Sequence, residues 1–535
     1  MKLPRLRGNG PVELRLSEFG GLDIRPGRDN GIKKIYGFTE EDYPIYRTEP
    51  LSYQRSVSVP ADAEYKMEKL LGQLAVCLNG SFYYPEGTYR GTLTQPVRCF
   101  GVMNDIIYLF PSKQYYDTVT QTFGSMERER TAAAGTLCFE DGTLYGEAAA
   151  ANTIHCDTAD FSVFHAGDAV TVSGCSALPE NNKTAIIREL DETGHKLRFS
   201  ENCFAVGTES GSVSIKVSVP DLDDVCVCEN RMWGYHGRTI YASKLGDPLN
   251  WAVYDGISTD SYTVSVDGEG NLTACTSFLG YPVFFRERQI YKVYGDKPSN
   301  FSLTAGAHSG VRAGAARSVC AVEDTLYYLS EVGMVSYSGG IPSALLEFGI
   351  ELHDCVCASD GKRLYVLSGE RLFRYTPRLR LWTELKPEPT ESNFVLFDIR
   401  CGNGYPVCFE RNGTGVRLST SARGAAAEGG VWSASDGRAE IVLGDFYLNK
   451  AEKLHIHEVT LRLTADSAAV QGSITALLHP DGGTGITMNE RSIPRSDGGR
   501  EYCFTAIPRR CSSFRISLSI TANARISILS AEFRN

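Results

Sequence analysis

The sequence predicts an all-β chain, built as a β-propeller of six or seven blades with an inserted small β-barrel and a C-terminal β-sandwich of jelly-roll type. Three observations predict this class. The composition, with 53 Gly, 27 Tyr and 24 Phe in 535 residues, favours many short strands joined by tight turns. Paired apolar runs recur along the body of the chain, and strict alternation of apolar and polar residues follows near its end.

The paired runs are clearest in residues 281–342. Val283-Phe284-Phe285 and a second run at 290–294 are parted by four residues, which predicts a β-hairpin. Residues 326–329 and 334–337 repeat the design. Further centres at Trp233, Tyr365 and Val407 give spacings of about 40–50 residues, the period of a four-stranded propeller blade.

Two earlier units, at 71–84 and 97–110, are read as the first blades, and 65–71 as a short turn of helix. No Gly-His…Trp-Asp signature marks a WD repeat. The aromatic side chains at strand spacing are expected to form blade cores rather than a glycan platform or a base-stacking strip.

The chain is divided as follows: an extended N-terminal arm at 1–50, the propeller at 51–132 and 220–420, the inserted β-barrel at 133–219, a linker at 421–430, and the sandwich at 431–535. The arm is expected to lie along its own body or a neighbouring subunit, or else to be a frayed tail with a terminal strand. The gap between the second and third blades is too long for one blade and has its own strand-like runs, for example 168–172 and 212–217. The small residues of SARGAAAEGG are typical of a linker.

Charge is distributed unevenly. The chain carries a net charge of −10, from 54 Lys+Arg and 64 Asp+Glu. From residue 431 onward there are 12 basic and 11 acidic residues, which leaves 42 basic and 53 acidic residues before it. The acidic body argues against a surface that grips phosphates, although a channel through which DNA passes without adhering stays open.

No stretch has the roughly 20 apolar residues that cross a bilayer, and the N-terminus lacks the apolar core of a secretory signal. The 16 cysteines are scattered, which favours folding in a reducing cytoplasm. Cys226/Cys228 and Cys355/Cys357 each have C-x-C spacing, which places both thiols on one face of a strand. Inert buried thiols are favoured over a redox or metal role.

Several polar groups could carry chemistry. His455 and His457 share one strand face, but no third metal ligand is obvious, with His479 a strand and a turn away. Surface or packing histidines are the favoured interpretation.

Asp221, Asp223 and Asp224 could bind calcium, yet they lack the spacing of a calcium-binding loop. The favoured interpretation is therefore a turn that leads into a blade.

Glu287, at a charged hairpin tip, would need a second carboxylate within about 5–10 Å to act as a glycosidase acid. Arg509-Arg510 could meet an anion but are more often ion-pair partners at the surface. The sequence therefore predicts no catalytic residue, no cofactor and no metal.

Short sequence segments along the chain resemble the propeller-based tail nozzle and packaged-DNA stabilisation proteins of tailed bacteriophages. They lie at 21–23, 42–44, 230–234, 241–251, 282–285, 294–295, 298–301, 337–342, 507–511 and 514–516. The resemblance implies a non-enzymatic virion protein, assembled in the bacterial cytoplasm. It implies a ring, commonly of six copies, that contacts other neck and tail proteins and guides or retains DNA. A glycan- or receptor-binding tail protein is the alternative, and a propeller glycoside hydrolase is the third possibility.

Overall fold

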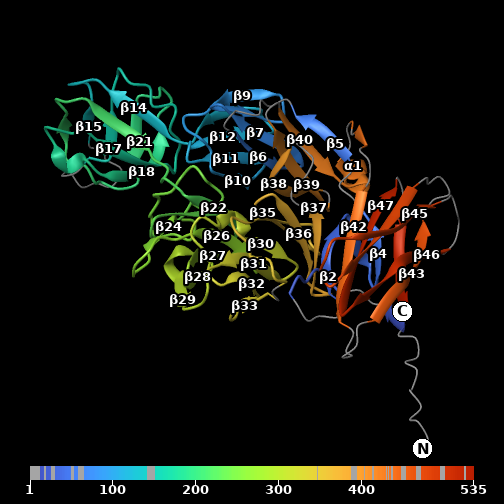
Figure 1. The fold of residues 1–535 in the computed structure, drawn as a ribbon. Coiled ribbons are helices and arrows are strands. Elements are labelled where there is room, and N and C mark those ends of the chain that lie inside the picture. Colours follow the sequence, from blue (N-terminus) through green and yellow to red (C-terminus); the bar gives the residue numbers. More distant parts are fainter. Residues whose placement is uncertain are drawn as a thin grey trace, which may run out of the picture. The chain divides into compact units, whose positions relative to one another are not determined.

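The computed structural model describes residues 13–16, 20–25, 31–49, 53–57, 65–140, 151–345, 348–386, 394–402, 404–412, 415–428, 431, 433–434, 438–447, 454–465, 472–493, 500–522 and 526–534. These ranges hold 48 strands, one α-helix and three 3-10 helices, so the all-β class is confirmed. The chain divides into two compact units (Figure 1), the first made of Met1–Asp62 and Arg317–Asn535 and the second of Ala63–Ala316. Within the described ranges, no helix has the length and apolar character needed to span a membrane.

The second unit contains four antiparallel four-stranded sheets of the blade type. Their strands are β6 (Tyr65–Leu70), β7 (Gln73–Leu78), β8 (Ser81–Tyr83) and β9 (Tyr89–Thr92); β10 (Cys99–Met103), β11 (Ile106–Phe110), β12 (Gln114–Asp117) and β13 (Phe123–Ser125); β22 (Asp224–Cys228), β23 (Arg231–His236), β24 (Thr239–Ala242) and β25 (Tyr262–Ser265); and β26 (Ala274–Phe278), β27 (Tyr281–Arg286), β28 (Gln289–Tyr294) and β29 (Ser302–Gly306). The first strands of successive blades contact each other, β10 against β22 and β22 against β26.

The first unit repeats the blade design. Its blade strands are β30 (Cys320–Val322), β31 (Thr325–Ser330), β32 (Gly333–Tyr337) and β33 (Ser343–Ala344); β34 (Val356–Ser359), β35 (Leu364–Ser368), β36 (Arg371–Thr376) and β37 (Leu381–Lys386); and β38 (Val395–Gly402), β39 (Tyr405–Asn412) and β40 (Gly415–Thr420). Strand β5 (Tyr53–Val57), from far earlier in the chain, pairs antiparallel with β40 and gives the last meander its fourth strand. Six four-stranded meanders from continuous chain, plus this composite one, confirm the β-propeller and match the expected six or seven blades.

The hairpin at residues 281–294 forms as predicted. Arg286 pairs with Gln289, so a two-residue turn connects β27 to β28. Phe284 is fully buried and packs with Trp233 in one cluster, which confirms that these aromatics are blade core. The expected helical turn at 65–71 is wrong: β6 is a strand that pairs with β7 through a turn in which Leu71 and Gly72 both have positive φ. Two positive φ values suit a tight hairpin turn and exclude a right-handed helix.

The insertion is an eight-stranded antiparallel sheet in the order β14-β21-β17-β18-β19-β16-β15-β20. Its strands are β14 (Arg128–Ala132), β15 (Cys138–Glu140), β16 (Thr153–His155), β17 (Ala169–Ser173), β18 (Thr184–Leu190), β19 (Lys196–Phe199), β20 (Gly207–Thr208) and β21 (Val213–Val217). It has its own apolar core, which includes Phe139, Ile187 and Phe199. Because β14 pairs with β21, the sheet begins at Arg128, a few residues before the expected boundary at 133. Its closure into a barrel stays a prediction.

Asp168 anchors the insertion to the adjacent blade. Its Oδ1 accepts hydrogen bonds from Arg128 Nη2 at 2.8 Å and from Asn250 Nδ2 at 3.0 Å. Asp168 is 3% exposed. Asn250 lies in the segment 241–251, one of those that resemble phage tail proteins, and its Nδ2 also donates a hydrogen bond to Asp247 Oδ2 at 2.7 Å. This segment therefore has a structural role, since it attaches the insertion to the loop that follows β24.

The remaining strands form two sheets in the first unit. They are β1 (Glu13–Leu16), β2 (Ile32–Tyr36), β3 (Phe38–Asp42), β4 (Ile45–Thr48), β42 (Arg438–Tyr447), β43 (Leu454–Ala465), β44 (Gly472–Pro480), β45 (Ile486–Ile493), β46 (Arg500–Cys511), β47 (Ser513–Ala522) and β48 (Ile526–Arg534). The short strand β41 (Ser433–Ala434) pairs instead with β5, at the edge of the last blade. One sheet has the order β3-β4-β48-β43-β46, with β1 beside β48, and the other runs β2-β42-β47-β44-β45. β2 also pairs in parallel with β37, so this second sheet continues into a blade.

Two expected features of this unit take a different form. The stretch predicted as an extended arm provides four strands, because Ile32, Ile35, Phe38 and Tyr46 are apolar at spacings that bury them, all at 0% exposure. Of these strands, β1, β2 and β4 pair with β42 or β48 of the first unit. The stretch predicted as a linker contains the helix α1 (Ala422–Glu428), since alanine has the highest intrinsic helix propensity.

We predict that Asp168→Ala loosens the insertion. The change leaves Arg128 and Asn250 without their shared acceptor, and hydrogen bonds to a charged group contribute about 1.5–3 kcal/mol each. Hydrogen exchange should therefore accelerate in Ala169–Ser173 and at 244–250. Glu192→Ala, which removes an exposed carboxylate of the same insertion, is the control and should leave both segments protected. Unchanged protection in Asp168→Ala would show that the anchor lies elsewhere.

Candidate functional site

Each unit contains a pocket lined by described residues. The pocket of the second unit has a volume of about 630 Å³ and lies at the ends of two adjacent blades. Two of the residues that the sequence singles out, Asp223 and Glu287, line it together with Tyr235, Asn271 and Arg286.

The carboxylates of this pocket are engaged in the local structure. Asp223 Oδ2 accepts a hydrogen bond from Gly237 N at 3.0 Å and lies 3.4 Å from His236 Nδ1. Glu287 Oε1 accepts one from Ala313 N at 3.1 Å. These contacts explain both residues as loop-fixing groups of the blades.

The three aspartates considered as a calcium site are directed to different partners. Asp221 pairs with Lys113 at 2.8 Å, and this contact lowers the pKa of Asp221. Asp224 Oδ2 accepts a hydrogen bond from Cys275 N at 3.3 Å. In the part of the chain that the structure describes, no three His, Cys, Asp or Glu side chains converge as metal ligands.

The candidate histidines and arginines lie on the C-terminal strands. His455 and His457 belong to β43 and Arg509 to β46, but their side chains are outside those that the structure describes. His479 lies on β44, in the other sheet, and its Nε2 contacts Ser517 Oγ at 2.8 Å. Arg510 is exposed.

The cysteine pairs lie in apolar surroundings. Cys226 and Cys228 of β22 both contact one blade core, as the C-x-C spacing predicts. Burial raises the pKa of Cys228 to about 11 and that of Cys357 well above its ordinary value. Cys355 precedes β34 and is 2% exposed. The thiols of Cys228 and Cys357 are therefore protonated at neutral pH.

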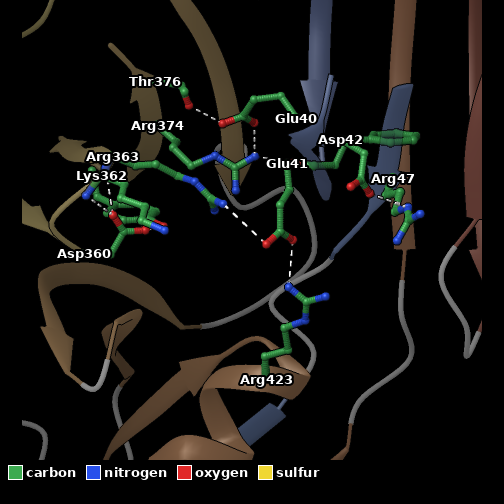
Figure 2. A network of polar contacts seen from close by, with 12 residues as sticks. Glu40, Glu41, Asp42, Arg47, Asp360, Lys362, Arg363, Arg374, Thr376 and Arg423 are labelled. Carbon is green, nitrogen blue, oxygen red and sulfur yellow. Dashed lines mark hydrogen bonds and ion pairs between the residues drawn. The ribbon is translucent and has the colours of Figure 1, made fainter. Parts of the chain in front are cut away.

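The pocket of the first unit, which we call the arginine pocket, has a volume of about 270 Å³. It is formed by the end of β3, the loop before β35, strand β36, the start of β39 and helix α1 (Figure 2). Its charged lining residues are Glu41, Glu49, Asp360, Lys362, Arg363, Arg374 and Arg423.

A buried ion pair lies at the base of the arginine pocket. Glu40 and Arg374 are each 2% exposed, and the guanidinium binds both the Glu40 carboxylate and the carbonyl oxygen of Phe38, the latter at 2.9 Å. Thr376 donates its hydroxyl to the other oxygen of Glu40. Burial raises the pKa of Glu40, but Arg374 and Thr376 outweigh it and hold the pKa below its ordinary value. Glu40 is therefore a carboxylate at neutral pH.

Nearer the solvent, Glu41 lies between two arginines. Its Oε2 is 2.7 Å from Arg423 Nη1 and its Oε1 is 4.0 Å from Arg363 Nη2. Figure 2 shows both guanidinium groups directed at this one carboxylate. Asp360 is engaged elsewhere, since it accepts hydrogen bonds from the backbone N of Arg363 at 2.7 Å and from Tyr365 Oη at 3.0 Å.

Comparison with known proteins shows no match to a family model and none to a curated protein. Solved structures are similar to parts of the fold at low identity. An exo-β-1,3-galactanase from Phanerochaete chrysosporium with galactose is 9% identical, with 57% of this chain and 92% of that chain covered and a TM-score of 0.21. YCF48 bound to D1 peptide is 13% identical over 55% and 91%, with a TM-score of 0.27. A fungal alcohol oxidase in complex with copper is 10% identical over 86% and 97%, with a TM-score of 0.31. These similarities carry no argument about function.

We predict that Glu40→Gln destabilises the first unit by about 3–5 kcal/mol, because it leaves the Arg374 charge buried without a counter-ion. Hydrogen exchange of Phe38–Asp42 against denaturant measures this loss. Arg378→Gln, which removes a largely exposed arginine from the connection after β36, is the control and should cost less than about 1 kcal/mol.

The same pair predicts a dependence on pH. Because the folded-state pKa of Glu40 is lowered, its contribution is present above the unfolded value of about 4.3 and is lost as pH falls through the folded value. Between neutral pH and pH values below that range, the wild-type chain should therefore lose more stability than Glu40→Gln. Parallel acid profiles would contradict the assignment.

Proposed function

We propose that the chain is a non-enzymatic structural subunit of a tailed-phage virion, which forms an oligomeric ring at the tail or neck and guides or retains DNA there. The observation that supports this proposal most is a set of buried carboxylate–arginine ion pairs in the first unit. Buried carboxylates pair with arginines within single blades, and one such pair connects a blade with the N-terminal strand β3. Such pairs define geometry more than they add stability, which suits a part that must hold its shape in an assembly.

Two further ion pairs of this kind lie in the blades of the first unit. Glu384 of β37 is 1% exposed and pairs with Arg371 of β36 at 2.8 Å. Glu410 of β39 is 2% exposed and pairs with Arg417 of β40 at 2.6 Å. Together with Glu40, these carboxylates fix neighbouring strands in the blades and in the adjoining hairpin. Each of these three carboxylates is paired with an arginine of the same unit.

The sheet connections favour the same function. Through β2, one nine-stranded sheet runs from the blade strands β34 to β37 into the C-terminal strands β42, β47, β44 and β45. A blade and a C-terminal sheet joined in this way give a subunit few hinges for internal motion. The net charge of −10 also suits a wall along which DNA moves without adhering. Partners of the ring would be further copies of the chain and other neck and tail proteins.

The alternative, a glycan- or receptor-binding tail protein, is supported by the pocket of the second unit. Its volume of about 630 Å³ lies in the size range of small-molecule sites, about 300–1,000 Å³. Tyr235, Asn271 and Gln289 offer it an aromatic ring and amide groups that suit a sugar. Glycan binding that is lost in Asn271→Ala would favour this alternative.

Mass photometry and negative-stain microscopy of the purified chain test the ring. We predict closed rings, commonly of six copies, whose fraction rises with protein concentration or with co-expressed neck and tail proteins. Particles of one copy under all of these conditions would overturn the proposal.

A further inference from the structure

We propose that Cys226 and Cys275, on the first strands of two neighbouring blades of the second unit, form a disulfide bond by exchange with a low-molecular-weight disulfide such as oxidised glutathione. The inference goes beyond the proposed function and does not depend on it, because it concerns two side chains inside one unit. The bond connects β22 to β26 covalently.

The two cysteines lie on the same blade boundary, because successive side chains of a strand point to opposite faces. On β22, Val225 and Val227 contact the core shared with the preceding blade, whereas Cys226 contacts the core shared with the following blade. Cys275 of β26 is buried in that same second core. Each thiol is therefore directed at the neighbouring blade that carries the other.

Three contacts define the register of the two strands. Asp224 Oδ2 accepts a hydrogen bond from Cys275 N at 3.3 Å. The thiols of Cys226 and Cys275 hydrogen-bond each other, and two residues further along both strands Cys228 hydrogen-bonds Ser277. Equal steps along both chains show that β22 and β26 lie side by side in the same direction. A disulfide needs adjacent backbones and side chains directed at each other, and this register provides both.

Cys226 is the thiol that reacts first. It is only partly buried, whereas Cys275 is 7% exposed. Burial, and after it the hydrogen bond with Cys226, raises the pKa of Cys275 well above its ordinary value. A thiol that holds its proton is the poorer nucleophile, so Cys275 enters only after a mixed disulfide has formed beside it.

The exchange proceeds in two balanced steps. The Cys226 thiolate attacks one sulfur of oxidised glutathione, forms a mixed disulfide and expels one glutathione thiolate. The Cys275 thiol then loses its proton to a departing thiolate, attacks Cys226 Sγ and expels the second glutathione. Two protein thiols are oxidised to one disulfide, and one glutathione disulfide is reduced to two glutathione thiols.

Peptide mapping of the full chain, exposed to oxidised glutathione under native conditions and then alkylated, tests the proposal. In the wild type the peptide with Cys226 should be linked to the peptide with Cys275, and the count of free thiols should fall by two. Dithiothreitol should restore both thiols.

Three variants separate the roles of the thiols. Cys226→Ala should abolish the link, and Cys275→Ala should abolish it while glutathione accumulates on Cys226. Cys228→Ala is the matched control, because Cys228 lies on the same strand and contacts Ser277 rather than a thiol. It should form the link as fast as the wild type does.

Hydrogen exchange of Asp224–Cys228 and Ala274–Phe278 before oxidation shows whether each variant is folded. If Cys228→Ala loses this protection, Cys99→Ala replaces it as the control, since the Cys99 thiol lies 3.9 Å from Asp223 O rather than at this blade boundary. Absence of the link in the wild type, or glutathione that stays on wild-type Cys226, would show that the two thiols do not meet. Loss of the link in the folded control would overturn the assignment equally.

Discussion

The buried pair of Glu40 and Arg374 is the constraint on which the architecture of the first unit depends. Desolvation of two charges opposes folding, so the pair is tolerated only where its geometry satisfies both groups. Here the Arg374 guanidinium binds the Glu40 carboxylate and the Phe38 carbonyl, and the Thr376 hydroxyl donates a hydrogen bond to the other oxygen of Glu40. The pair therefore fixes β3 against β36. Any other placement of the N-terminal hairpin would leave Arg374 unpaired.

The N-terminal and C-terminal parts of the chain fold together as a consequence. The hairpin of β3 and β4 pairs with β48, and β2 lies between β37 and β42 in one sheet. Strand β5 continues from this segment and completes the last blade. Residues 431–535 alone would lack these partner strands, so the C-terminal sheets are not an independent module. A study of that region should retain the N-terminal strands.

The blades could be predicted from sequence because their information is local. The runs that form β27 and β28 lie a turn apart, and apolar residues such as Phe284 identify the buried face. The N-terminal strands were harder to predict, because Phe38 and Tyr46 look like isolated aromatics until their partners are known. The short turn at Leu71 was misread since its two positive φ values have no sequence signal besides Gly72.

The arginine pocket could not be predicted from local patterns. Glu40 and Arg374 are 334 positions apart, and no spacing rule connects them. The signal in the sequence is indirect: Glu40 follows Phe38 by two positions, so on a strand the two side chains share one face, and burial of Phe38 places Glu40 on the buried side. By contrast, Asp223 and Glu287 were singled out by residue type, and the structure brings them to one pocket where loop contacts explain them.

The most direct test of this account is a double-mutant cycle on the central pair, with Glu40→Gln, Arg374→Met and the double variant. Native-state hydrogen exchange of Phe38–Asp42 reports the local free energy of opening in each. The account predicts that each single variant loses more than about 3 kcal/mol, and that the double variant is more stable than the sum of the losses by over 1 kcal/mol. Losses that add within about 0.5 kcal/mol would show that the two residues are not coupled and would contradict the account.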